Sequence, residues 1–254
     1  MSEEERSQFG MSGVEKVNQL YGGEELRALQ RKDGRFVNAG MIANVFGAVA
    51  SDQLEDGRVI SGIGGQYNFV SMAHALPDGR LIMMIRSTRG TGKTLKSNIV
   101  FKYGHCSVPK HLRDIIVTEY GIADLRGKPD KDVIMEMIKV ADSRFQDELL
   151  KQAKAAGKVP AHYEIPPEYR NNYPEKYESL LKPYQAQGYF QPFPFGTDLT
   201  ENEIALGGSL KAMKALATGH PLKLVSGLFL ELFRPIPKQA AKYLEMMELA
   251  KPSS

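Results

Sequence analysis

The sequence predicts an α/β fold in which an open sheet is flanked by helices, and three observations support this. Short, partly β-branched apolar runs recur in the first half of the chain, as "GRLIMMIRST", "SNIVFKYG" and "RDIIVTEYG". Gly, Pro or polar residues bound each run, which is typical of buried strands. Apolar residues then recur at helical spacing through residues 130–157. Strands followed by helices within about 150 residues indicate one layered α/β domain.

In chain order, the first expected element is helical and covers residues 11–32. Its "GGEELRALQRK" places acidic residues before basic ones, as the helix dipole favours. A short strand at "GRVI" then runs into a glycine-rich turn, and the three apolar runs follow as further strands. Asp130 is a suitable cap for the helical stretch and Gly157 a suitable end. These elements make up a first domain, residues 1–157.

The composition changes after Gly157. Residues 158–199 are rich in Pro and Tyr and show weak periodicity, so we expect an extended arm that lies over the core or over a neighbouring subunit. Residues 200–254 are expected to be a helical appendage. It has a capped helix from Thr200, an apolar run broken at Pro235 and Pro237, and a final amphipathic helix.

The bulk composition excludes several classes of protein. The 254 residues are 42% hydrophobic and 25% charged, with a formal charge of +3 and no long basic run, which argues against nucleic-acid binding. The single cysteine, Cys106, fits a reducing compartment. The polar N-terminus is unlike a secretory signal, and no run of about 18 apolar residues could span a membrane. A soluble, cytoplasmic protein is expected.

"STRGTGKTLKS" at residues 87–97 contains the Gly-Lys-Thr end of a phosphate-binding loop. The first glycine that such a loop requires falls on Ser87, and a strand-like run follows where a helix is needed. We therefore expect a loop between two strands and no nucleoside triphosphate site. Arg86, Arg89 and Lys93 form either a solvated basic turn or a surface that meets a phosphate electrostatically.

Two other stretches point to chemistry. "SGIGGQYNF" at residues 61–69 contains Gly62, Gly64 and Gly65, which let the main chain approach a ligand with its N–H groups free for a carbonyl oxygen that becomes negative. In "RDIIVTEYG", Glu119 ends a buried strand, the position at which open α/β sheets bind ligands. A carboxylate there is either paired or functional.

Taken together, "SGIGGQYNF" and the later "VTEYGIADLRGK" resemble the C-terminal domain of the acetyl-CoA hydrolase/transferase family, which includes the succinyl-CoA:acetate and 4-hydroxybutyrate CoA-transferases. The resemblance covers roughly residues 15–155. It implies a CoA-transferase-type fold with the active site between two related domains. A glutamate attacks the acyl-CoA thioester in that family, and the resulting mixed anhydride becomes a glutamyl-CoA thioester. Coenzyme A enters as acyl-CoA substrate, and no metal is expected.

The resemblance also implies roles for individual residues. Gly64 or Gly65 is expected to donate a main-chain N–H to the thioester oxyanion. Glu119 matches the second active-site glutamate of the family, which positions substrate or polarises the nucleophile; it could equally be the base that activates water in a hydrolase. An active-site asparagine of the family corresponds to either Asn18 or Asn38. Two further turn residues, Gly62 and Gln66, are expected beside the substrate or CoA.

One departure from the family pattern concerns the nucleophile. The family carries its nucleophilic glutamate in a G-[IL]-H-[ST]-E segment, and this sequence has no such segment. The expectation is half of an acyl-CoA site that is inactive alone and needs an N-terminal CoA-transferase domain. The alternative is a non-catalytic CoA-binding or partner-docking domain. The acyl group, the acceptor (water or a small carboxylate) and a homodimeric state stay open.

The remaining candidates have structural interpretations. We expect Cys106 to be a small buried residue, since "KYGHCSVPKHL" offers no orienting acid for a nucleophile, and His105 and His111 lack a third metal ligand nearby. His74 is expected to pack on a helix, and Asp124 and Arg126 to form a salt bridge. Four aromatic residues of the arm are interpreted either as a stacking platform or as packing onto the core: Tyr189, Phe190, Phe193 and Phe195.

Overall fold

A computed structural model of the chain describes residues 1–220, 222, 225–227, 229 and 238–247. The chain divides into two compact units, Met1–Pro183 and Tyr184–Ser254. In the described residues, helices long and apolar enough to cross a membrane are absent. The domain boundaries expected from the sequence remain predictions.

Three short helices open the first unit: α1 (Glu3–Ser7), α2 (Glu15–Asn18) and α3 (Glu24–Gln30). The helical segment expected over residues 11–32 is therefore interrupted. Gly22 and Gly23, which lie between α2 and α3, have φ values of +74° and +133°. Such angles lie outside the helical region, so the two glycines separate the helices.

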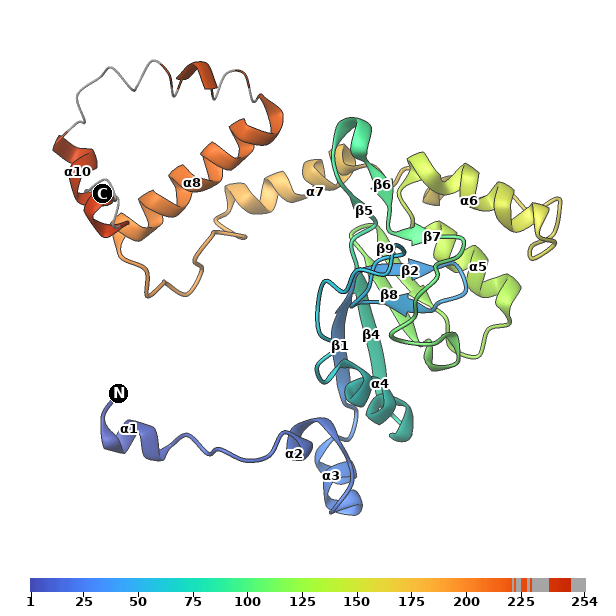
Figure 1. Cartoon of the computed structure of the whole chain (residues 1–254). Coiled ribbons are helices and arrows are strands. Elements are labelled where there is room, and N and C mark those ends of the chain that lie inside the picture. Colours follow the sequence, from blue (N-terminus) through green and yellow to red (C-terminus); the bar gives the residue numbers. More distant parts are fainter. Residues whose placement is uncertain (221, 223–224, 228, 230–237, 248–254) are drawn as a thin grey trace. The chain divides into compact units, whose positions relative to one another are not determined.

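The first sheet holds the strands that position the candidate site. Its order is β1 (Arg35–Gly40), β4 (Arg80–Ile85), β8 (Ile115–Thr118) and β9 (Gly121–Asp124). β1, β4 and β8 run parallel, and β9 turns back antiparallel to β8 (Figure 1). The strands expected at "GRLIMMIRST" and "RDIIVTEYG" are confirmed.

A second sheet has the order β3 (Val49–Ala50), β2 (Ile42–Asn44) and β7 (Ile99–Val100). "SNIVFKYG" thus contributes only Ile99 and Val100 to this sheet. The strand expected at "GRVI" is wrong, because Val59 and Ile60 are 70% and 53% exposed and this segment makes only an isolated bridge between Gln53 and Val59. An apolar run without a buried neighbour gains little from forming a strand.

The Gly-Lys-Thr stretch forms a hairpin. β5 (Thr88–Arg89) pairs antiparallel with β6 (Lys96–Ser97), and a 3₁₀ turn, η1 (Gly92–Thr94), lies between them. The expectation of a loop between two strands is confirmed. The helix that a phosphate-binding loop requires does not follow it.

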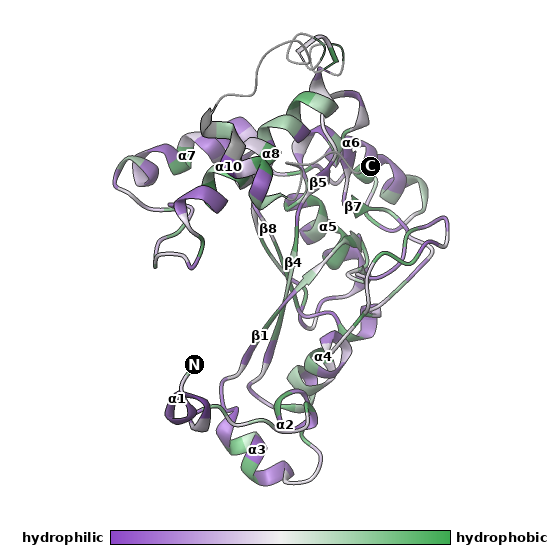
Figure 2. Ribbon diagram, turned by 60° about the vertical axis from the view of Figure 1, so that its left-hand side comes forward, coloured by the Kyte–Doolittle hydropathy of each residue, from purple (hydrophilic) through white to green (hydrophobic). Residues whose placement is uncertain are grey.

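Helices cover one face of the first sheet. α4 (Gln66–Ala75), α5 (Asp130–Lys139) and α6 (Ser143–Ala155) lie on the same side of β1, β4 and β8 (Figure 2). Their apolar residues form one core with the inward side chains of the strands and of the second sheet. The mixed α/β architecture of open sheets flanked by helices is confirmed.

The stretch expected as one helical run divides into α5 and α6. Asp142 separates them: its backbone is extended and its side chain accepts a hydrogen bond from the Arg144 N–H, so it caps α6. Asp130 is the first helical residue of α5, with Pro129 in the cap position. Gly157, at φ +62°, follows the last residues of α6 and ends it as expected.

The Pro/Tyr-rich segment is not wholly extended. It contains η3 (Pro167–Tyr169) and a helix, α7 (Pro174–Ala186), which has Pro183 inside it. Because this segment is rich in proline and tyrosine, its sequence shows little of the periodicity from which a helix is predicted. The remaining short element of the first unit is η2 (Lys110–Leu112), which precedes β8.

In the second unit, α8 (Glu201–Gly219) begins at Thr200 with a capping box between Thr200 and Glu203, as the sequence predicts. α10 (Lys238–Met246) corresponds to the expected final helix. The apolar run broken at Pro235 and Pro237 lies largely outside the described residues. The four aromatic residues of the arm are exposed.

Candidate active site

The parallel strands of the first sheet bring three chain segments to one edge. β1, β4 and β8 all end at this carboxyl edge, where Ser87 follows β4 and Glu119 directly follows β8. Neighbouring strands lie about 4.8 Å apart, so the ends of β1 and β8 are separated by about 10 Å with β4 between them. Open α/β sheets bind ligands at such an edge.

The glycine turn precedes α4. Gly64 has φ +57°, and a Cβ there would have no atom within 4 Å, so the turn is open on that side. Gly65 is the N-cap residue of α4. Neither the Gly64 nor the Gly65 N–H donates a hydrogen bond to any described residue. Gly62 is exposed and also has open space at its Cβ position.

Gln66 ties this turn to the sheet. Its Nε2 donates to the main-chain oxygen of Ala39, 2.8 Å away, one residue before the end of β1. Its Oε1 is buried and has no hydrogen-bond partner in the described residues. The side chain of Gln66 therefore fixes the N-terminus of α4 at the carboxyl edge.

Glu119 is anchored at the same edge. Its Oε2 accepts from the main-chain N–H of Ser87 at 2.9 Å, and its Oε1 accepts from the Ser87 hydroxyl at 2.6 Å. Ser87 is fully buried, and its own main-chain oxygen accepts from the Asn98 N–H. Two hydrogen bonds from one fixed residue hold the carboxylate in one orientation.

Beside Glu119 lies a partly buried polar pair that the sequence did not indicate. The Tyr120 hydroxyl donates to Oδ2 of Asp142 at 3.1 Å, and Asp142 has no exposed surface. Burial raises the pKa of Tyr120, and the negative charges of Asp142 and Glu119 raise it further. Burial alone would raise the pKa of Asp142, but the hydrogen bonds from Arg144 and Tyr120 outweigh it and lower that pKa.

The two candidate asparagines occupy different positions. Asn18 ends α2 and is 4% exposed, and its Oδ1 has no partner among the described residues. Its Nδ2 lies 3.1 Å from the position of a Cβ on Gly65, so it packs directly against the turn. Asn38 is half-buried on β1, paired in register with Met83.

The pattern that defines the acetyl-CoA hydrolase/transferase C-terminal domain matches residues 2–153. This chain belongs to that family. The 4-hydroxybutyrate coenzyme A transferase of Clostridium kluyveri is 30% identical over 119 residues, which are 46% of this chain and 28% of the relative. A probable butyrate:acetyl-CoA coenzyme A-transferase of Syntrophomonas wolfei is 32% identical over 121 residues, 46% of this chain and 27% of the relative. The chain thus matches little more than a quarter of each relative.

Solved structures of RipA are also similar. A point-mutant structure of RipA has a TM-score of 0.51 and 29% identity, and covers 57% of this chain and 32% of that chain. The crystal structure of RipA from Yersinia pestis has a TM-score of 0.49, with 29% identity, 57% and 32% coverage. The family match over residues 2–153 confirms the sequence expectation of the acetyl-CoA hydrolase/transferase family.

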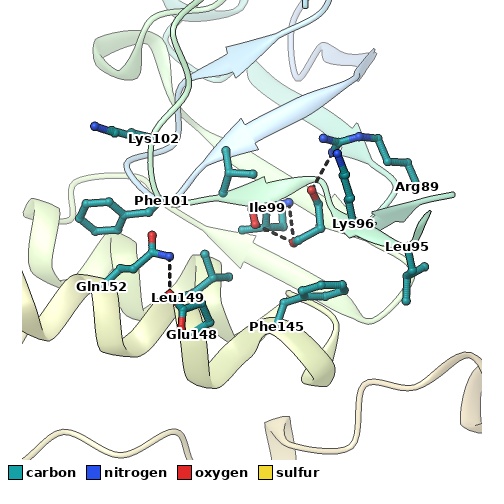
Figure 3. A pocket seen from close by; sticks show the side chains of 12 residues that line it. Arg89, Leu95, Lys96, Ile99, Phe101, Lys102, Phe145, Glu148, Leu149 and Gln152 are labelled. Carbon is teal, nitrogen blue, oxygen red and sulfur yellow. Dashed lines mark hydrogen bonds between the residues drawn. The ribbon is translucent and has the colours of Figure 1, made fainter. Parts of the chain in front are cut away.

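In this acetyl-CoA hydrolase/transferase domain, the pocket drawn in Figure 3 is lined by none of the residues that the sequence predicts at the acyl-CoA site. Its volume is about 380 Å³, and it lies between the β5–β6 hairpin, β7 and α6. Apolar side chains such as Leu95, Ile99 and Phe145 line it, with Arg89 and Lys96 at one end (Figure 3). Arg89 is engaged, because it donates to the Ser97 main-chain oxygen and to Oδ1 of Asn98.

A smaller pocket adjoins the glycine turn of the domain. Its volume is about 170 Å³, and Asn18 lines it together with Tyr67, Asn68 and Ser71 of the first turns of α4. This pocket, and not the one in Figure 3, contains a residue expected at the acyl-CoA site. The pairing of Ser87 with Glu119 could not be found from the sequence, because the two residues are 32 positions apart.

The remaining sequence expectations have mixed outcomes. Asp124 and Arg126 form the expected salt bridge, with Nη2 and Oδ2 2.5 Å apart, and these hydrogen bonds from Arg126 lower the pKa of Asp124 to about 2. His74 lies on a helix, α4, as expected, but it is exposed instead of packed, and its Nε2 forms a hydrogen bond with the Leu112 main-chain oxygen. The expectation that Cys106 is buried is wrong: it lies exposed in a loop without regular structure.

Proposed function

We propose that this domain supplies the C-terminal half of the active site of an acyl-CoA hydrolase or CoA-transferase. One observation carries the proposal: the N–H groups of Gly64 and Gly65, which donate to no residue in the described part of the chain, are fixed by Gln66 to the same sheet edge at which Ser87 holds Glu119. The site therefore combines donors for an oxyanion with an oriented carboxylate. Family membership supports the same reading.

The reaction begins with a thioester carbonyl at the glycine turn. When a carboxylate oxygen attacks the carbonyl carbon, the carbonyl oxygen becomes negative, and the N–H groups of Gly64 or Gly65 stabilise it. The N-terminus of α4 adds the positive end of its dipole. The C–S bond then breaks, the thiolate of CoA leaves and a mixed anhydride remains. A well-aimed oxyanion donor contributes ~3 kcal/mol to transition-state stabilisation.

Glu119 is poorly suited to be the attacking carboxylate. Both of its oxygens accept hydrogen bonds from Ser87, which lowers their nucleophilicity and fixes their direction. It fits better as the group that orients the nucleophile or substrate, or that accepts a proton from attacking water. The nucleophile then comes from a glutamate outside these residues, so the domain alone lacks turnover.

Asn18 and Gln66 suit the rest of the substrate. Each has a buried oxygen without a hydrogen-bond partner in the described residues, and both lie beside the glycine turn. The arm of CoA that ends in its thiol carries two amides, whose N–H groups could satisfy such oxygens. Asn38 remains the alternative asparagine for the site.

The glycine turn can be tested with a matched pair of variants. Gly64→Ala should lower the kcat of the complete enzyme by about 10²–10³-fold, because φ +57° is unfavourable for alanine and the N–H shifts from the oxyanion. Gly127 has φ +64° and equally open space, yet lies away from the turn, so Gly127→Ala should keep the wild-type kcat. Equal losses in both variants would contradict the oxyanion role.

A second test separates the proposed half-site from a non-catalytic CoA-binding or docking domain. Acetyl-CoA hydrolysis and CoA exchange are measured on this chain alone and together with an N-terminal family domain. Turnover should require both parts and fall in Glu119→Gln. Turnover by the chain alone that Glu119→Gln abolishes would make Glu119 the nucleophile. CoA binding without turnover in either arrangement would favour the non-catalytic alternative.

A further inference from the structure

The outward face of the β1–β4–β8–β9 sheet is apolar and open. Val37 on β1, Met84 on β4 and Ile122 on β9 are 54%, 47% and 68% exposed. Isolated exposed apolar residues are common, but these three belong to one surface. The strand register shows this directly.

Two rows of outward side chains cross the sheet. Ala39, Met84, Val117 and Ile122 are successive partners in one row, and Val37, Ile82, Ile115 and Asp124 in the next. Because side chains alternate between the faces of a strand, all eight point away from the core. Seven of them are apolar, and the eighth, Asp124, lies at the β9 edge and is ion-paired with Arg126. A continuous apolar patch of this kind marks an interaction site.

The parallel strands indicate what kind of structure covers this face. Parallel sheets are almost always covered on both faces, usually by helices. The inward face already has α4 and α5, with α6 packed on α5 (Figure 2). The outward face therefore lacks a helical layer in the first unit.

Charges around the patch define the partner further. Arg35 and Arg80 lie beyond one end of the two rows, and Arg86 lies beyond the other. Arg35 and Arg80 donate only to main-chain oxygens, and none of the three forms an ion pair with a described carboxylate. A helix with an apolar stripe and acidic residues at its flanks would match both features.

We infer that this face binds amphipathic, acid-flanked helices of the N-terminal part of an acetyl-CoA hydrolase/transferase polypeptide. The curated relatives contain more than three times the matched length, so they have the material for such a layer. The identity of the partner rests on the proposed half-site. The apolar face is inferred independently of that half-site, from the exposed fractions of its side chains and from the strand register.

The test uses thiol labelling of the whole chain in a Cys106→Ser background. Single cysteines are placed on the face by Met84→Cys or Ile122→Cys, and on the exposed surface of α6 by Lys151→Cys. The probe is the part of the Clostridium kluyveri 4-hydroxybutyrate CoA-transferase that precedes the matched region, co-expressed with each variant. Maleimide labelling at positions 84 and 122 should slow at least tenfold in the presence of the probe, and labelling at 151 should stay the same.

Other outcomes overturn the inference. Unchanged labelling at 84 and 122 means that the face does not bind this partner. If labelling of the chain alone is slow and becomes slower at higher protein concentration, a second copy of the chain covers the face. If it is slow at every concentration, another segment of the same chain covers it. Protection without turnover would contradict the proposed half-site but support the docking face. Turnover without protection would support the half-site but contradict the docking face.

Discussion

The two faces of the first sheet come from alternate residues of the same strands, yet only one is buried. Met83 is 2% exposed and its neighbour Met84 is 47% exposed. The strand sets which way each side chain points, but elements far away in sequence decide which direction is covered. The inward face is buried and therefore contributes most to the stability of the fold. The outward face is exposed to a binding partner.

The largest stability difference should separate the two methionines. Met83→Ala removes a core side chain and should lower the free energy of unfolding by about 2–5 kcal/mol. Met84→Ala should change it by no more than ~0.5 kcal/mol, because the side chain is largely in solvent already. Urea unfolding followed by circular dichroism measures both. Similar losses would mean that the outward face is covered in the isolated chain.

An intermediate effect is expected for the buried carboxylate on the covered side. Asp142→Asn keeps a helix cap but removes the charge that Arg144 and Tyr120 bind, which should cost about 1–3 kcal/mol. Folding lowers the pKa of Asp142, so its contribution is present above the ordinary value of about 4 and is lost as the pH falls through the folded value.

The stability gap between wild type and Asp142→Asn should therefore narrow as the pH is lowered from about 6 to about 3. Thermal unfolding at several pH values measures this gap. Arg170→Gln serves as control, because Arg170 binds Asp147 at the surface, where side chains are 42% and 73% exposed. A gap for Asp142→Asn that is constant over this range would show that its charge adds nothing to stability.

Local patterns in the sequence predicted what depends on local physics. β4 and β8 follow from compact apolar runs, the start of α8 from Thr200 and Glu203, and the end of α6 from Gly157. Apolar residues recur at helical spacing through both α5 and α6. The sequence therefore did not reveal that one helix ends and the next begins at Asp142.

What the sequence could not predict depends on long-range contacts. "GRVI" has strand-like residues but no buried neighbour, so the expected strand is wrong. The contacts of Ser87 with Glu119 and of Tyr120 with Asp142 join residues 32 and 22 positions apart. The glycine-rich turn and the carboxylate at the end of a strand were enough to predict the candidate site from the sequence. The hydrogen bonds that orient these residues depend on the fold and could not be predicted.

The smallest effect is expected on the outward face itself. Ile122→Thr keeps a β-branched side chain in β9, so it should alter the free energy of unfolding by no more than about 0.5 kcal/mol, while reducing the fluorescence of a hydrophobic dye bound to the chain. The adjacent Ala123 is fully buried, so Ala123→Thr should cost about 1–3 kcal/mol through overpacking and leave dye binding to the native state unchanged. If Ile122→Thr destabilised the chain as much as Ala123→Thr, the two faces would not differ in burial, and the open apolar surface would have to be abandoned.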